Sequence, residues 1–193
     1  MITASEMRPG TAIRFQGQPY KIISADYHPG QGKMGGVAHA RLQNLDTGTF
    51  WEHSFRSEIK LDEISLEKRL LEFLYADADH CCFMDPHTYE QTEVERQIVG
   101  DRASFLESGM RLTVEFAEGR PVGVVFPDVL EVKIADTAPP THQQADSGFK
   151  RAVLPNGVEM MVPQFVKTGD MIRLDLQNKR YMDRARAEAK GKG

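Results

Sequence analysis

Short stretches in which apolar and polar residues alternate constrain this chain more than any other feature. They recur along its 193 residues and are separated by turn sequences such as Asp46-Thr47-Gly48 and Pro155-Asn156-Gly157. Alternation with a period of two is typical of strands with one buried face, and closely spaced turns are typical of small barrels and sandwiches. We therefore predict an all-β protein, with strands near residues 12–15, 20–23, 37–45, 81–84, 111–116, 121–126, 130–134, 158–162 and 171–176.

Two stretches have helical features. Residues 101–107 could form one or two turns before Gly109. In residues 66–74 the leucines have helical spacing, and periodicity alone leaves helix and strand open there. Long helical patterns between the strands are missing, which disfavours a parallel βαβ architecture.

Composition excludes several classes of protein. With 40% hydrophobic and 27% charged residues, the chain is not wholly disordered. No apolar run approaches the ~18 residues of a membrane-spanning helix, and the first ten residues have no apolar signal core. The two cysteines, Cys81 and Cys82, are adjacent and cannot form a disulfide framework, which indicates a reducing compartment, most simply the cytoplasm.

Charge is distributed unevenly. Residues 1–63 carry 7 basic and 7 acidic side chains, residues 64–130 carry 6 and 13, and residues 131–193 carry 11 and 8. The net charge of −4 argues against a protein that simply coats DNA. An acidic middle and a basic end allow one part of the chain to meet an anionic partner while another part avoids it.

The glycine-rich segment from His28 to Gly36 is the most unusual local feature. Its glycines match a GxGxxG pattern, but a dinucleotide site needs a helix after the loop, whereas residues 37–45 have a strand pattern. We therefore predict a β-hairpin whose tip carries Lys33 on a narrow loop. Spacing alone favours the simpler interpretation, a lysine that is merely solvated at that tip.

Three stretches of the chain resemble the bacterial elongation factor P family over nearly the full length. The last third carries a Lys, Ala, Gly, Val-Pro, Gly series at Lys150, Ala152, Gly157, Val162-Pro163 and Gly169. The middle carries Tyr75-Ala-Asp77, Phe83-Met-Asp85 and Tyr89-Glu-Gln91. The first third carries Pro29-Gly30 and Lys33, then Leu42-Gln-Asn-Leu45 and Thr47-Gly48.

The resemblance implies three small β-barrel domains in an L-shaped, tRNA-like arrangement. An SH3-like, KOW-like domain would span residues 1–64, an acidic OB-fold domain residues 65–129, and a second OB-fold domain with a basic tail residues 130–193. In that fold residues 66–74 form a strand. The resemblance also implies a monomeric cytoplasmic protein without cofactor, metal or membrane.

The function implied is that of a translation elongation factor and not of an enzyme. Such a factor binds the 70S ribosome beside the peptidyl-tRNA and promotes peptide-bond formation at stalled polyproline sequences. The finger facing the peptidyl transferase centre would be Pro29, Gly30, Gln31, Gly32, Lys33, Met34, Gly35 and Gly36. Further candidate RNA contacts are His28, His39, Arg41, Lys150, Arg184 and Arg186.

Lys33 occupies the place at which many family members carry a lysine that a modifying enzyme lengthens. The loop departs from the common Pro-Gly-Lys-Gly pattern at Gln31 and Met34, which leaves modification open. His142-Gln143-Gln144 stands where relatives often have Gly-Asp-Thr, so the mRNA contact of that motif is not carried over. Two alternatives remain: a nucleotide-binding enzyme that uses the glycine loop, and a general OB-type RNA binder.

Other candidate sites have simpler interpretations. We expect one of Cys81 and Cys82 to face inward and the other outward, without redox function. The group Asp77, Asp79, His80, Asp85 and His87 has no metal-ligand spacing, and we expect turn and strand-end roles there. Residues 135–149 read as a loop or linker, and the residues after Tyr181 as a basic, frayed tail.

Overall fold

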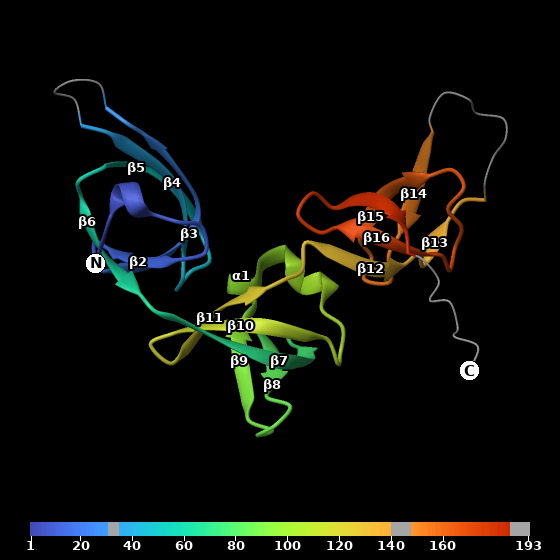
Figure 1. Cartoon of the computed structure of the whole chain (residues 1–193). Helices are drawn as coiled ribbons and strands as arrows, with labels where there is room; N and C mark the ends of the chain where they lie inside the picture. Colours follow the sequence, from blue (N-terminus) through green and yellow to red (C-terminus); the bar gives the residue numbers. More distant parts are fainter. Residues whose placement is uncertain (31–34, 140–147, 186–193) are drawn as a thin grey trace, which may run out of the picture. The chain divides into compact units, whose positions relative to one another are not determined.

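The computed structural model of the chain describes residues 1–30, 35–139 and 148–185. These residues form strands, turns and a few short helical segments, which confirms the predicted all-β class (Figure 1). The chain divides into two compact units, residues 1–125 and 126–193. The division into three domains expected from the sequence, with boundaries after residues 64 and 129, stays a prediction.

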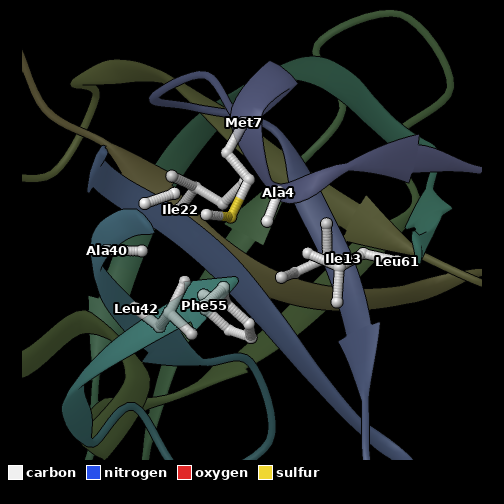
Figure 2. Packing of buried hydrophobic residues seen from close by; sticks show 9 residues of the cluster. Ala4, Met7, Ile13, Ile22, Ala40, Leu42, Phe55 and Leu61 are labelled. Atoms are coloured by element: carbon white, nitrogen blue, oxygen red, sulfur yellow. The ribbon is translucent and has the colours of Figure 1, made fainter. Parts of the chain in front are cut away.

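An antiparallel six-stranded sheet opens the first unit. Its spatial order is β1 (Ile2–Thr3), β6 (Lys60–Ile64), β2 (Ala12–Phe15), β3 (Gln18–His28), β4 (Val37–Asn44) and β5 (Phe50–Arg56). A 3₁₀ turn, η1 (Ala4–Glu6), contributes Ala4 to the apolar cluster inside this sheet. Figure 2 shows that cluster, in which side chains from β2, β3, β4, β5 and β6 converge on one another. Alternation in the strands thus directs one set of side chains into a common core.

A five-stranded antiparallel sheet completes the first unit. Its order is β11 (Arg120–Val125), β10 (Arg111–Ala117), β7 (Leu66–Ala76), β8 (His80–Met84) and β9 (Gln91–Glu95). After β9 the chain forms the helical turn α1 (Arg96–Val99) and the 3₁₀ helix η2 (Gly100–Phe105). The helical segment predicted at 101–107 is therefore a 3₁₀ helix that ends at Phe105, before Gly109.

The segment with helically spaced leucines is a strand, as the family resemblance implied. Residues of β7 pair with β10 on one side and with β8 on the other. Leu71 and Phe73 are buried, whereas Leu70 is 57% exposed. The leucines therefore lie on both faces of a strand, and their helical spacing does not describe a single buried stripe.

The second unit consists of two small antiparallel sheets. One has the order β12 (Val129–Lys133), β16 (Met171–Asp175) and β17 (Arg180–Arg184), and the other β13 (Asp136–Thr137), β14 (Phe149–Val153) and β15 (Glu159–Pro163). Both sheets contribute alternating buried residues, among them Val132, Ala152, Val162, Ile172 and Leu174. The strands predicted near 130–134, 158–162 and 171–176 are confirmed within one or two residues at each end.

Both cysteines are buried, which corrects the expectation that one of them faces outward. Cys81 pairs in register with Val94, while the thiol of Cys82 lies 3.7 Å from Oε1 of Gln91. Neighbours in a strand point to opposite faces, and here cross-strand side chains such as Gln91 lie against the outer thiol. Alternation in the sequence predicts which face of the strand each cysteine occupies, but it does not predict whether other side chains cover that face.

The acidic and histidine-rich group forms turns, as predicted. Oδ1 of Asp77 accepts hydrogen bonds from the backbone N–H groups of Asp79 and His80, at 2.8 and 2.7 Å. Oδ1 of Asp85 accepts from the N–H groups of His87 and Thr88, at 2.7 and 3.2 Å. Within the described residues, no group of three or more His, Cys, Asp or Glu side chains could hold a metal ion.

Candidate functional site

The predicted hairpin around the glycine-rich loop is present. Strands β3 and β4 pair from Tyr20 opposite Asn44 to His28 opposite Val37, with a bulge between Ile22 and Ser24. We call β3, β4 and residues 29–36 the finger hairpin, and its two strands can be followed in blue in Figure 1. Because a strand and not a helix follows the loop, the hairpin lacks the helix N-terminus that a dinucleotide site requires.

The described part of the loop consists of Pro29, Gly30, Gly35 and Gly36. The other four loop residues, 31–34, lie outside the described residues, and Lys33 is one of them. The geometry of the site is therefore that of the hairpin and of the two ends of its loop.

The returning end of the loop is held by close packing. A β-carbon at Gly36 would lie 2.7 Å from Cε2 of Tyr27 and 3.0 Å from the carbonyl oxygen of His28. The carbonyl oxygen of Gly36 accepts a hydrogen bond of 2.8 Å from the backbone N–H of Ser57. Only a glycine allows this approach without displacing a neighbour. The contacts with Tyr27, His28 and Ser57 therefore fix the backbone at Gly36, where the chain enters β4.

The outer face of the finger hairpin carries three of the predicted contact residues. The rings of His28 and His39 meet edge to face, with centroids 5.3 Å apart, and Nδ1 of His39 lies 2.7 Å from Oγ of Ser54. Arg41 stacks over the ring of Phe50, at 4.8 Å from its centroid. These three candidates therefore lie on one strand pair, beside its neighbour β5.

A shallow groove crosses this outer face. It has a volume of about 390 Å³, and its lining includes Asp26, His39, Arg41 and Glu52. Arg41 stands opposite Glu52 in the β4–β5 register, so a cation and carboxylates line the same groove. It is polar and open, a surface suited to an extended polar ligand and not to a small apolar molecule.

Lys150, a candidate of the second unit, is engaged with its own unit. It is largely buried, and its ammonium group donates a hydrogen bond to the carbonyl oxygen of Ala138. Burial lowers the pKa of Lys150 below the ordinary value. This placement leaves little of the side chain accessible, so we do not include Lys150 in the candidate site.

Arg184 is half exposed and anchored. Its guanidinium group lies over the ring of Phe165, at 4.7 Å from the centroid, and donates a 2.7 Å hydrogen bond to the carbonyl oxygen of Phe165. The same group lies 3.3 Å from Oδ2 of Asp170. Arg186 lies outside the described residues.

Sequence reasoning missed the residues that hold the loop in place. Tyr27 borders Gly36, Ser57 bonds to it, and a carboxylate oxygen of Glu58 would lie 3.2 Å from a β-carbon at Gly35. Ser57 and Glu58 follow β5 and are separated from the loop by two strands. No motif marks them, because they act through backbone proximity.

Family models match the chain in three consecutive segments. The elongation factor P KOW-like domain matches residues 3–61, the elongation factor P OB domain residues 66–124, and the elongation factor P C-terminal domain residues 130–184. None of the helices among the described residues is long and apolar enough to cross a membrane.

Individual relatives match along nearly the whole length. Elongation factor P of Parvibaculum lavamentivorans is 39% identical over 185 residues, which are 95% of this chain and 98% of the relative. Elongation factor P of Chelativorans is 38% identical over 186 residues, 95% of this chain and 98% of the relative. Among solved structures, eukaryotic translation initiation factor 5A from Methanococcus jannaschii is 20% identical, with a TM-score of 0.47, over 64% of this chain and 92% of that one.

These sequence matches cover both compact units of the chain. They also set aside the nucleotide-binding enzyme considered from the glycine loop, since the matched proteins are elongation factors. The chain therefore belongs to the elongation factor P family of translation factors.

Proposed function

We propose that this protein binds the 70S ribosome beside the peptidyl-tRNA and promotes peptide-bond formation at stalled polyproline sequences. In this proposal the finger hairpin presents Lys33 toward the 3′ end of the tRNA. The observation that carries it is the finger hairpin itself: long paired strands that end in a glycine-rich loop, fixed at Gly36. Family membership supports the translation role as a whole.

The physical need for such a factor comes from proline. Its ring fixes φ and hinders the nitrogen, so consecutive prolines hold the reacting groups in unproductive geometries. Ordering two reacting groups can lower a barrier by several kcal/mol or more. A protein that restricts the 3′ end of the tRNA can therefore accelerate the reaction while the ribosome performs the chemistry.

The finger supplies a compact positive charge on a slim support. A lysine ammonium group is a point charge on a flexible four-carbon stem, and the tRNA end offers phosphates and sugar hydroxyls to it. Glycines add no side-chain bulk, which suits entry into a channel lined by RNA. His28, His39 and Arg41 lie on the outer face of the same hairpin and extend the contact along the RNA.

A reconstituted translation assay tests this function. The template encodes three consecutive prolines, and the rate of full-length synthesis is measured with the wild-type protein, Lys33→Ala and Lys60→Ala. Lys60 is an exposed lysine in β6, outside the finger hairpin. We expect Lys33→Ala to lose most of the stimulation, on the order of tenfold or more, and Lys60→Ala to retain it. Full stimulation by Lys33→Ala would overturn the proposal.

Modification of Lys33 is a separate part of the proposal. A lysine-modifying enzyme would lengthen the side chain, which extends its reach and adds mass to the protein. Intact-mass spectrometry of the protein from its native cell measures this directly. A mass equal to that of the unmodified chain would remove the modifying enzyme from the proposal and leave the ribosomal role in place.

A further inference from the structure

Glu115 is a buried carboxylate that the proposed function does not use. It lies in β10 with 2% of its surface exposed, between Lys68 of β7 and Gly123 of β11 in the sheet register. Its neighbours Val114 and Phe116 are also buried, so the strand is covered on both faces at this point. Gly123 leaves room for the carboxylate, since a β-carbon there would lie 3.4 Å from Oε2 of Glu115.

The partner of Glu115 comes from the finger hairpin. Nζ of Lys21, in β3, lies 2.5 Å from Oε2 of Glu115, and Nζ of Lys68 lies 3.9 Å from Oε1. Lys21 stands on the strand that leads to the glycine-rich loop. The ion pair therefore joins the finger hairpin of the six-stranded sheet to β10, an inner strand of the five-stranded sheet.

Other contacts between the same two sheets surround this pair. Apolar contacts join Ala12 and Leu45 of the first sheet region to Ala117 and Val122 of the second. At the β4–β5 turn, a β-carbon on Gly48 would lie 2.8 Å from the carbonyl oxygen of Gln97.

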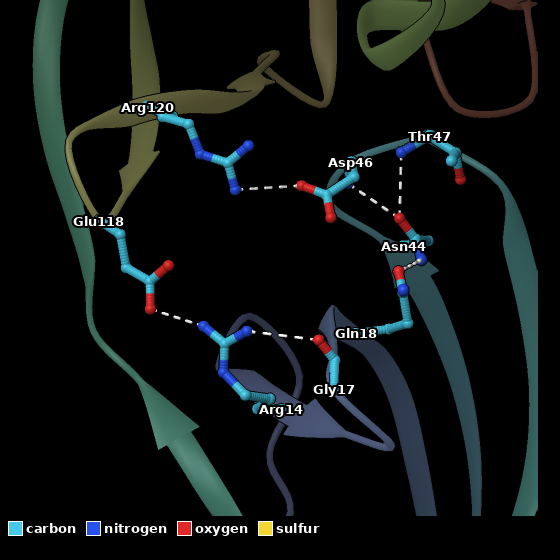
Figure 3. A network of polar contacts seen from close by, with 8 residues as sticks. All are labelled: Arg14, Gly17, Gln18, Asn44, Asp46, Thr47, Glu118 and Arg120. Carbon is cyan, nitrogen blue, oxygen red and sulfur yellow. Dashed lines mark hydrogen bonds and ion pairs between the residues drawn. The ribbon is translucent and has the colours of Figure 1, made fainter.

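Exposed ion pairs add to this junction. Arg14 lies 2.5 Å from Oε1 of Glu118, and Arg120 lies 3.2 Å from Oδ1 of Asp46. Figure 3 shows both pairs. Pairs of this kind contribute little each because water competes for both charges. The pair of Lys21 and Glu115 has the larger effect, since loss of Lys21 leaves the covered carboxylate of Glu115 with only the more distant Lys68, at 3.9 Å.

We propose that Glu115 is a positioning residue for the finger: through Lys21 it holds the finger hairpin in one orientation relative to the five-stranded sheet. This inference rests on the proposed function, because an oriented finger matters only if its tip must reach a defined point. Small misplacements of a group that orders reactants are costly. The five-stranded sheet thus serves as the base from which the finger is aimed.

The orientation can be measured by residual dipolar couplings of backbone amides in the full-length protein. In the wild type, we expect a single alignment tensor to describe both β3–β4 and β7–β10. In Lys21→Met and in Glu115→Gln, we expect the two sheets to require different tensors. Lys21→Arg retains the cation and should restore one tensor. Glu72→Gln is the matched control, because Glu72 pairs with Arg111 inside the five-stranded sheet.

The same variants are then compared in the polyproline assay. We expect Lys21→Met and Glu115→Gln to lose stimulation by on the order of tenfold, and Lys21→Arg and Glu72→Gln to retain it. Unchanged tensors with full stimulation in Lys21→Met would overturn the inference. If Glu115→Gln does not fold, the comparison of Lys21→Met with Lys21→Arg tests the same ion pair from its other partner.

The two proposals fail in different ways. If Lys33→Ala keeps full stimulation, the function proposed for the finger is wrong, whatever the tensors show. If Lys33→Ala loses stimulation while Lys21→Met keeps both stimulation and the single tensor, only the positioning role of Glu115 is wrong.

Discussion

The backbone of Gly36 lies against the ring of Tyr27, so closely that a β-carbon at position 36 would be 2.7 Å from Cε2 and 2.8 Å from the hydroxyl oxygen. The carbonyl oxygen of His28 bounds the same space at 3.0 Å. The returning end of the loop is thereby set against the last residues of β3. This packing makes the base of the finger a defined structure.

Replacement of Gly36 by alanine should therefore disturb the base of the finger. The methyl group must displace the Tyr27 ring and strain the backbone at His28, and overpacking of this kind typically costs about 1–3 kcal/mol. Gly35→Ala is the matched control, because its nearest neighbour is the flexible carboxylate of Glu58 at 3.2 Å. We expect that control to stay within about 0.5 kcal/mol of the wild type.

Urea unfolding measures both changes. If Gly36→Ala and Gly35→Ala unfold at the same urea concentration, the close approach at Gly36 does not constrain the loop. A double variant, Gly36→Ala with Tyr27→Ala, should recover part of the loss, because removal of the ring creates room for the methyl group.

The core of the six-stranded sheet gives a second prediction. Phe55 is fully buried and packs edge to face against Phe15, with ring centroids 5.1 Å apart. Phe55→Ala removes the ring and leaves a cavity, which should lower the free energy of unfolding by about 3–5 kcal/mol. Phe50→Ala, on the same strand but 56% exposed, should lower it by less than about 1 kcal/mol.

The single tryptophan makes this measurement local. Trp51 lies in β5 and stacks with His53 at a centroid distance of 4.5 Å, so its fluorescence follows the unfolding of this sheet. Equal midpoints for the two phenylalanine variants would mean that Phe55 is not the packing centre that its burial indicates.

Much of this architecture follows from the pattern of residues along the chain. Period-two alternation identifies the strands of both units, and the turn residues separate them. The pattern fails where its assumption of one buried face fails. Glu115 reads as a solvated strand residue, yet it is covered because a second sheet packs on the outer face of β10. Only the three-dimensional junction supplies that information.

The candidate site follows from the sequence to a similar extent. The hairpin follows from alternation on both sides of the glycines, whereas the contact of Ser57 with Gly36 depends on the path of the chain after β5. The burial of Lys150 could have been predicted from strand alternation. Lys150 is two residues from the buried Ala152, so both side chains share the inner face of β14. Its charge, taken alone, indicates an outward position.

The turn at Asp85 predicts a loss of stability in acid. Hydrogen bonds from the backbone N–H groups of His87 and Thr88 hold the pKa of Asp85 below its ordinary value of 3.8. A carboxylate whose pKa is depressed by folding stabilises the protein above the pKa of the unfolded chain. That stability is lost as the pH falls below 3.8 and through the pKa of the folded state.

Asp85→Asn should therefore flatten the acid limb of the stability curve. The amide still accepts hydrogen bonds, but it carries no charge to lose. The free energy of unfolding is measured by urea titration from neutral pH down to strongly acidic pH. Curves of the wild type and of Asp85→Asn that run parallel below pH 3.8 would show that the ionised Asp85 does not contribute in this way.

The two adjacent cysteines should be unreactive in the folded protein. Cys81 is fully buried and Cys82 nearly so, and burial raises the pKa of the Cys81 thiol. The thiolate is the nucleophile, and a covered thiol with a raised pKa supplies little of it. We therefore expect iodoacetamide to leave both residues unmodified under native conditions and to label both in denaturant, as read by intact mass.

Glu93→Cys, on an exposed position of the neighbouring strand β9, should add one thiol that reacts at once. Rapid native labelling of Cys82 would mean that the Gln91 side chain beside it does not cover it. Labelling of both cysteines at one common slow rate would instead show that they become accessible only when the five-stranded sheet opens as a unit.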